Sequence, residues 1–219
     1  MESISSSARK TPLADDGRLI AFEGVEGAGK STQIELVAAA LRHDGFTVVE
    51  TREPGGTALG AEIRRMVMHS TGTPPSPMAE LLLYLADRAQ HLAEVVVPAL
   101  DRGQVVLCDR FSASTLVYQG YARQLGIDRV RELDAIVRAG VWPALTVVLD
   151  CPVEKGLQRA RGDDRFHREQ VAFHERVRQG FLTLAREDPG TYAVIDGMLP
   201  ADEVTGQILD RVRRCLQTP

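Results

Sequence analysis

The sequence predicts an α/β fold in which helices cover both faces of a parallel β-sheet. Short apolar runs alternate along the chain with segments of helical spacing. The runs are continuously apolar, which is typical of strands buried on both faces. The first run, Leu19–Glu23, leads directly into a glycine-rich turn and then a helix. Alternating strands and helices of this kind favour a parallel sheet between two helical layers.

The elements are expected in the following order. The predicted strands are Leu19–Glu23, Thr47–Thr51, Val105–Asp109, Leu145–Asp150 and Tyr192–Asp196. The predicted helices are Ser31–His43, Gly60–His69, Ala79–Leu100, Ser112–Ala122, Asp128–Ala139, Val153–Arg161, Glu169–Arg186 and Ala201–Leu216. Pro98 is expected to end or kink the third helix. We expect one domain over residues 18–217, preceded by a disordered polar tail at residues 1–17.

Composition excludes several classes of protein. Of the 219 residues, 44% are hydrophobic and 26% charged, which fits a globular domain rather than a disordered chain. The net charge of −4 disfavours a nucleic-acid binder. Cys108, Cys151 and Cys215 are widely spaced and odd in number, which indicates free thiols in a reducing compartment. No apolar run approaches the roughly 18 residues of a membrane span, so we expect a cytoplasmic enzyme that binds neither membrane nor nucleic acid.

The turn after the first strand has the spacing G-x-x-x-x-G-K-[ST], from Gly24 to Ser31. Glycines let consecutive backbone N–H groups surround a phosphate, and the following helix adds its positive end. Lys30, one of three lysines in a chain with 23 arginines (26 − 3), suits the phosphate oxygens, and Ser31 suits Mg²⁺. The residues predicted to bind ATP are Gly24, Val25, Glu26, Gly27, Ala28, Gly29, Lys30, Ser31 and Thr32. The motif indicates ATP and Mg²⁺ but leaves the phosphate acceptor open.

A second group of candidates follows the third predicted strand. Asp109 ends that strand, where a carboxylate can hold Mg²⁺ directly or through water, and Arg110 suits an anion. Thr115 and Gln119 share one helix face and can meet a base edge. A purely structural alternative is a polar helix face with Tyr118 partly in the core.

Taken together, these residues resemble the thymidylate kinase family, and its bacterial type in particular. The resemblance covers nearly the whole chain from residue 18. It rests on FEGVEGAGKST (22–32), TREPGGT (51–57), GAEIRR (60–65), LLLYLADRAQH (81–91), CDRFSASTLVYQGYAR (108–123), LDCPVEKGLQRAR (149–161) and VIDG (194–197). It implies the three-layer fold of the P-loop nucleoside monophosphate kinases, with a five-stranded parallel sheet. It also implies the reaction ATP + dTMP → ADP + dTDP, and a homodimer.

The resemblance assigns roles on the acceptor side. It implies that Tyr84, where Phe is more usual, stacks on the base and that Arg88 reaches a base carbonyl. On the residues alone, the favoured interpretation makes Tyr84 a core residue and Arg88 a surface residue. The other implied roles are Arg64 and Arg110 on the dTMP phosphate, Glu53 near the phosphates and as a metal ligand beside Ser31 and Asp109, Glu26 near the acceptor sugar, Tyr118 beneath the deoxyribose, and Thr115 with Gln119 at the base edge.

Arginines cluster late in the chain and resemble the lid of the bacterial enzymes, at residues 159–168. The cluster consists of Arg159, Arg161, Arg165 and Arg168. Phosphoryl transfer needs positive charge on the moving phosphoryl group, and the phosphate loop contains no arginine. Arg161, and after it Arg165, are the expected catalytic arginines, together with Lys30 and Arg110. A solvated charged loop is the plainer alternative.

Two alternatives for the function stay open. The chain can be a kinase of another pyrimidine or purine monophosphate. It can also be a nucleotide-dependent switch, although the absence of an NKxD sequence disfavours an ordinary GTPase.

Overall fold

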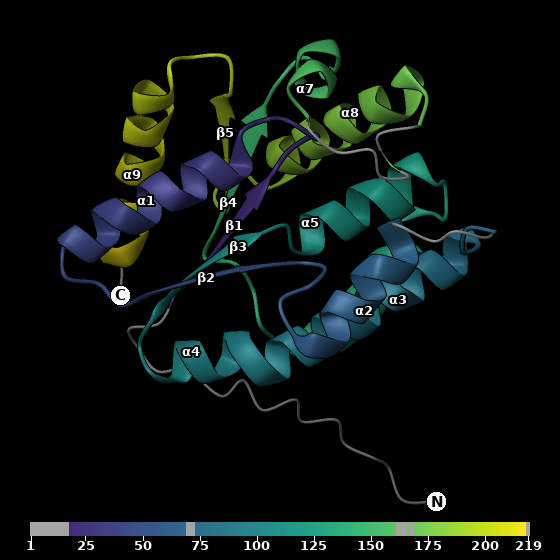
Figure 1. Cartoon of the computed structure of the whole chain (residues 1–219), viewed down its shortest axis with the longest axis horizontal. Coiled ribbons are helices and arrows are strands. Elements are labelled where there is room, and N and C mark those ends of the chain that lie inside the picture. The colour runs from purple at the N-terminus through teal and green to yellow at the C-terminus, as the bar shows by residue number, and fades with distance from the viewer. Residues whose placement is uncertain (1–17, 69–72, 161–165, 167–168, 218–219) are drawn as a thin grey trace, which may run out of the picture.

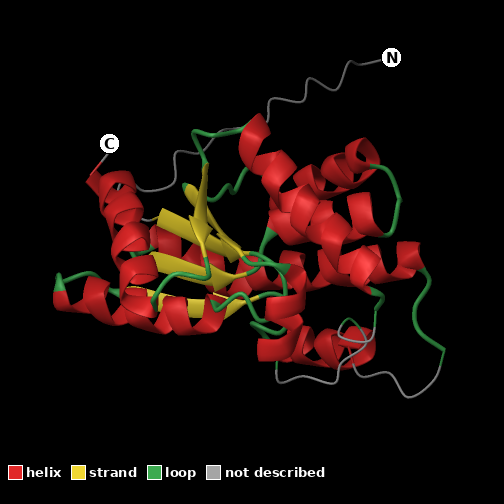
Figure 2. Cartoon of the chain, turned by 90° about the horizontal axis from the view of Figure 1, so that it is seen from above, coloured by secondary structure: helices red, strands yellow, loops and turns green. Residues whose placement is uncertain are grey.

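The computed structural model describes residues 18–68, 73–160, 166 and 169–217 (Figure 1). The predicted tail at residues 1–17 lies outside these ranges. A five-stranded parallel sheet has the strand order β2-β3-β1-β4-β5. Figure 2 shows its strands in yellow, flanked by helices in red. Its strands are β1 (Arg18–Glu23), β2 (Val48–Arg52), β3 (Val105–Asp109), β4 (Leu145–Asp150) and β5 (Tyr192–Asp196). The predicted parallel α/β sheet is confirmed, with strand ends within one residue.

Helices cover both faces of the sheet. They are α1 (Lys30–His43), α2 (Ala58–Met68), α3 (Pro77–His91), α4 (Val97–Asp101), α5 (Ser112–Thr115), α6 (Ile127–Arg138), α7 (Val153–Arg159), α8 (Val171–Glu187) and α9 (Ala201–Gln217). Helices α1 and α9 pack together on one face, while α8 lies against β4 and β5 on the other. Successive residues of β1 enter different core clusters, Ile20 with α1 and Leu19 with α4. Burial on both faces explains why the strands are continuously apolar.

Two predicted helices are interrupted. The predicted helix over Ala79–Leu100 is divided into α3, a π-helical turn at Leu92–Val96, and α4. Pro98 lies in the first turn of α4, where a residue without a backbone N–H is tolerated. Because proline has no N–H to donate to the preceding turn, it interrupts the regular α-helical hydrogen bonding there. The predicted helix over Ser112–Ala122 is α5 followed by a π-helical segment, Leu116–Ala122. Such segments often accompany functional sites.

The strand register brings the functional ends of three strands together. Phe22 and Arg52 both lie opposite Asp109 in the ladders that flank β3. Parallel strands end at the same edge, so the loops after β1, β2 and β3 meet there. Ligands of open α/β sheets bind outside this edge.

Candidate active site

A cleft of about 590 Å³ opens at the carboxyl edge of the sheet. Its walls come from the loop after β1, the ends of β2 and β3, helices α2 and α3, the segment after β3, and the end of α7. The predicted site residues that line it are Glu26, Gly27, Gly29, Lys30, Ser31, Thr32, Glu53, Arg64, Tyr84, Arg88, Asp109, Arg110, Thr115, Tyr118 and Gln119. Residues far apart in the sequence thus meet at one cavity.

The phosphate loop joins β1 to α1 and provides one end of the cleft. Gly29 has a φ of 95° immediately before α1, a backbone conformation that favours glycine. Gly24, Val25 and Ala28 do not line the cleft, and the side chains of Val25 and Ala28 belong to the hydrophobic core. These three residues therefore shape the loop from behind, while Glu26, Gly27 and Gly29 face the cavity.

Lys30 is held inside its own loop. Its side chain is buried, and Nζ donates to the carbonyl oxygens of Gly24 (3.2 Å) and Val25 (2.9 Å). Burial, and then the positive charge of Arg110, lower the pKa of Lys30 to about 8. A bound polyphosphate would supply negative charge that reverses this shift, so the loop is electrostatically prepared for an anion.

Ser31 and Asp109 form an oxygen-rich corner beside the loop. Ser31 Oγ donates to Asp109 Oδ2 at 3.2 Å. Asp109 Oδ1 is buried and has no hydrogen-bond partner among the described residues. A buried carboxylate oxygen without a donor suits a hard cation such as Mg²⁺. The described residues contain no cluster of three or more histidine, cysteine, aspartate or glutamate side chains, so phosphate and water oxygens would have to complete the coordination of that cation.

Arg110 follows Asp109 with a left-handed backbone, at φ 71°. Its backbone N–H donates to Phe22 O (2.9 Å), and Cys108 Sγ donates to its carbonyl oxygen (3.0 Å). Hydrogen bonds to both backbone polar groups thus stabilise the left-handed conformation of Arg110. The guanidinium donates to Ser114 Oγ (3.1 Å). Burial lowers the pKa of Arg110, but the nearby Tyr118 and Asp109 more than offset this effect and raise it. Arg110 is thus a fixed cation facing the cleft.

Glu23, at the end of β1, organises this turn and was missed by sequence reasoning. It is fully buried, and its Oε1 accepts from the backbone N–H groups of Phe111 (2.9 Å) and Ser114 (3.0 Å). Its Oε2 accepts from Ser114 Oγ at 2.5 Å. Burial raises the pKa of the carboxyl group, which the hydrogen bonds partly oppose. The available signal was an acid ending an otherwise apolar strand.

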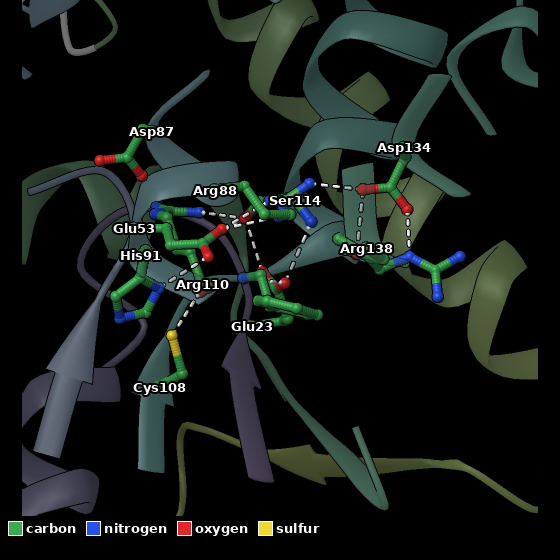
Figure 3. A network of polar contacts seen from close by, with 12 residues as sticks. Glu23, Glu53, Asp87, Arg88, His91, Cys108, Arg110, Ser114, Asp134 and Arg138 are labelled. Carbon is green, nitrogen blue, oxygen red and sulfur yellow. Dashed lines mark hydrogen bonds and ion pairs between the residues drawn. The ribbon is translucent and has the colours of Figure 1, made fainter. Parts of the chain in front are cut away.

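The opposite wall is held by a buried chain of alternating charges (Figure 3). Arg88 donates through Nε to Glu53 Oε2 (2.8 Å) and through Nη1 to Asp134 Oδ1 (2.5 Å). Asp134 Oδ2 in turn accepts from Arg138 Nε at 2.6 Å. These four side chains, on α3, on α6 and after β2, are each at most 4% exposed. Asp134 was not anticipated because its partner Arg88 lies 46 positions away, and Arg138 joins the chain of charges only through Asp134, four residues before it on α6.

Glu53 is engaged on both carboxylate oxygens. Arg88 occupies Oε2, and His91 Nδ1 lies 2.8 Å from Oε1, while His91 Nε2 lies 2.6 Å from Thr51 Oγ1. Close by, Asp87 accepts from the backbone N–H of Gly55 at 3.0 Å. Burial, and then the charge of Glu53, raise the pKa of Asp87 to about 6. The carboxylates around Arg88 thus serve to hold this arginine and the turn after β2.

The remaining predicted acceptor residues lie between these two walls. Arg64 Nη1 donates to Pro54 O at 3.0 Å, which ties α2 to the turn after β2. Gln119 Nε2 donates to Glu80 Oε1 at 2.8 Å. Tyr118 packs edge-on against Phe166 at 5.7 Å and lies under the Arg110 guanidinium at 5.2 Å. Tyr84, Thr115 and Gln119 are partly or fully covered by their neighbours and reach the cleft.

The predicted lid is described only in part. Arg159 and Phe166 line the cleft, and Arg159 Nη1 donates to Gly197 O at 3.2 Å. Helix α7 ends at Arg159 rather than Arg161, because Ala160 is extended. The predicted catalytic arginines Arg161 and Arg165, and also Arg168, lie outside the described residues.

Comparison with known proteins gives consistent similarities. A family model described as thymidylate kinase matches residues 22–208. Thymidylate kinases of Trichlorobacter lovleyi and Geobacter sulfurreducens are 49% and 48% identical over 211 residues, which cover 91% and 90% of this chain and 99% of each relative. The crystal structure of thymidylate kinase from Ehrlichia chaffeensis matches with a TM-score of 0.74 at 30% identity, covering 90% of this chain and 98% of that one. The matched region includes every wall of the cleft described above.

Proposed function

The chain belongs to the thymidylate kinase family, and from this premise we propose how its cleft carries out the family's phosphotransfer, ATP + dTMP → ADP + dTDP. The observation that carries the proposal is the arrangement of two anion sites in one cavity. The phosphate loop with Lys30 forms one, and Arg64 with Arg110 forms the other. A donor phosphate chain and an acceptor phosphate can thus be held end to end.

On the donor side, we propose that Gly24–Thr32 holds the ATP phosphates. Backbone N–H groups and the start of α1 supply the positive field, and Lys30 exchanges its two backbone carbonyl partners for phosphate oxygens. Among the lid arginines, Arg161 and Arg165 stay the proposed catalytic pair. They would neutralise the charge that develops on the transferred phosphoryl group.

For Mg²⁺, the residues present fit a site at Ser31 and Asp109. The partnerless, buried Oδ1 of Asp109 and the hydroxyl of Ser31 are both oxygen ligands of the kind that Mg²⁺ uses. Because Arg88 and His91 occupy both oxygens of Glu53, we propose that Glu53 acts near the phosphates without binding the metal directly. When bound, Mg²⁺ supplies charge neutralisation to the donor phosphates.

On the acceptor side, we propose that Arg64 and Arg110 hold the dTMP phosphate, with Glu26 near the sugar. The two carboxylate partners of Arg88 use three of its five N–H donors, which leaves two for a base carbonyl. Tyr84 offers a ring face, and Thr115 with Gln119 offers polar atoms for the base edge. Tyr118, clamped between Arg110 and Phe166, would exclude a 2′-hydroxyl.

The catalytic strategy follows from these positions. The dTMP phosphate is already anionic at neutral pH, so the reaction needs no strong general base. Alignment of the two phosphates and neutralisation of their charge provide the rate enhancement. The chain's own residues thus bind, orient and shield the reacting groups.

The decisive experiment measures acceptor-dependent ADP release with dTMP, dUMP, UMP, CMP, AMP and GMP in parallel. We expect dTMP to be the preferred acceptor, with UMP at least about 100-fold slower because the ribose hydroxyl has no space. Equal turnover on UMP and dTMP would contradict the role of Tyr118. A lack of acceptor-dependent release with every monophosphate would instead favour a nucleotide-dependent switch.

We further propose a cytoplasmic homodimer. Helices α2, α3 and α6 pack side by side and expose large apolar side chains. The exposed fractions are 48% for Leu59, 52% for Leu82 and 75% for Ile136, and a second copy of the chain would cover them. A light-scattering mass of one chain at micromolar concentration would contradict the dimer.

Within the described ranges every helix is too short or too polar to traverse a lipid bilayer, and all three cysteines are free.

A further inference from the structure

The phosphate loop rests directly on the backbone of helix α7. A Cβ atom built on Gly156, in the middle of α7, would lie 2.4 Å from the carbonyl oxygen of Glu26. A Cβ atom on Gly27 would lie 2.0 Å from the carbonyl oxygen of Gly156 and 3.1 Å from the backbone nitrogen of Ala160. Real Cβ atoms do not approach backbone so closely, so the two segments touch where neither has a side chain.

The two glycines are required for different reasons. Gly27 has a φ of 69°, so its backbone conformation alone favours glycine. Gly156 has ordinary helical geometry, is buried, and lies inside a helix, where glycine is among the poorest residues. Local propensity therefore favours alanine at position 156, and the close approach of Glu26 opposes it. A residue that is kept against its local helix propensity often supports a functional site.

Helix α7 connects this contact to the cleft. It starts three residues after the end of β4 and ends at Arg159, which lines the cavity and donates to Gly197 O (3.2 Å). Gly156 lies one helical turn before Ala160, and its carbonyl oxygen accepts from the Ala160 N–H at 2.9 Å. A displacement of α7 away from Glu26 would thus carry Arg159 away from the loop that holds the donor phosphates.

We propose that Gly156 is a positioning residue for phosphoryl transfer, which fixes the distance between the phosphate loop and the α7 end of the cleft through backbone contact with Glu26 and Gly27. The inference rests on the proposed function and adds to it a residue without any side chain in the site. It predicts a larger defect for the donor than for the acceptor, because most acceptor residues come from α2, α3 and the segment after β3, whereas Glu26 is the acceptor-side residue whose backbone touches α7.

The test compares Gly156→Ala with Gly206→Ala. Gly206 is also helical, in α9, but a Cβ there meets nothing within 4 Å, so this control gains the same helix propensity without the clash. For Gly156→Ala we expect kcat/KM for MgATP to fall 10- to 100-fold while dTMP binding, measured by calorimetry, changes less than twofold. Gly206→Ala should match the wild type in both measurements. An unchanged kcat/KM for MgATP in folded Gly156→Ala protein, or equal losses for ATP and dTMP, would overturn the proposal.

A second measurement covers the case in which Gly156→Ala does not fold. In the wild type, magnesium tripolyphosphate should slow hydrogen exchange in the backbone of residues 156–160 at least fivefold, because it fills the loop that rests on them, whereas dTMP should not. Equal exchange with and without tripolyphosphate would overturn the proposal. A wild-type protein that binds MgATP but phosphorylates no monophosphate would contradict the proposed function instead. The contact between Gly156 and the phosphate loop would then be tested by the MgATP affinity of Gly156→Ala alone.

Discussion

The two ends of the cleft are built by opposite means. The donor end consists mainly of backbone: a glycine-rich loop, the start of α1, and a helix that approaches close enough to exclude side chains. The acceptor end consists of buried ion pairs, in which Arg88 is held between Glu53 and Asp134. Backbone N–H groups can surround phosphates, which look alike in every nucleotide. A base differs from another base at particular atoms, so its reader must be a side chain held in one orientation.

The difference implies that the donor end can lose activity without losing stability. In Lys30→Ala, kcat should fall about 10³-fold, since a preorganised charge on the transition state is removed. The free energy of unfolding should change by at most about 1–2 kcal/mol, because the buried ammonium makes two backbone hydrogen bonds but is penalised by desolvation. Urea denaturation and steady-state kinetics on the same preparation test both statements. Lys155→Ala, at an exposed position of α7, is the matched control, and a comparable loss of kcat there would contradict the assignment.

At the acceptor end, loss of a buried acid should damage both properties. Asp134→Ala leaves Arg88 and Arg138 without their shared carboxylate in a buried site, which costs about 3–5 kcal/mol of unfolding free energy. The KM for dTMP should rise about tenfold, while the KM for ATP should stay within about twofold, because Arg88 loses one of its two anchors.

Asp210→Ala provides the control for this variant. Asp210 pairs with Arg214 at 3.5 Å on the surface of α9, where both side chains are about 70% exposed. Such pairs contribute less than about 1 kcal/mol. If Asp134→Ala raised both KM values equally, the buried chain of charges would be a general scaffold rather than a support for the base reader.

The pH dependence should separate the two ends as well. The pKa of Lys30 is lowered to about 8 in the folded protein, so kcat/KM for ATP, which reports the free enzyme, should fall above pH 8, approaching tenfold per unit. The profile for dTMP at saturating ATP should lack this step at pH 8, because bound phosphates raise the pKa of Lys30. An identical step in both profiles would contradict the role of Lys30 as a donor-side cation.

The lowered pKa of Lys30 also determines the direction in which the free energy of unfolding changes with pH. Between about pH 8 and the ordinary lysine value of 10.5, the unfolded chain holds the Lys30 proton more tightly than the folded protein. This residue's contribution to the free energy of unfolding therefore increases as pH rises through that window, and its penalty is fully present below pH 8. Lys30→Met should remove this component from a stability–pH series.

The sequence was sufficient where function depends on neighbours along the chain. Lys30 and Ser31 belong to one motif, and Asp109 ends an apolar run, so spacing and strand position locate all three. Glu23 escaped because its partners Phe111 and Ser114 lie 88 and 91 positions away. Asp134 escaped because Arg88, the arginine that it holds, lies 46 positions away. A single sequence carries no record of such pairings. The π-helical turns were missed for a related reason, because local propensity does not distinguish them from ordinary helix.

The smallest expected effect concerns Tyr84, where the family usually has Phe. If the ring face is what the base uses, Tyr84→Phe should change the KM for dTMP by less than about threefold, because the ring is retained. Tyr84→Leu, which keeps an apolar side chain but removes the ring, should raise it about tenfold, in line with about 1–3 kcal/mol for stacking of one base. Tyr84 also lies within electrostatic reach of Arg64 and Arg110. A larger loss in Tyr84→Phe than in Tyr84→Leu would therefore shift the role of this residue from the base to the phosphate, and would make the acceptor end depend on a hydroxyl as well as on its buried ion pairs.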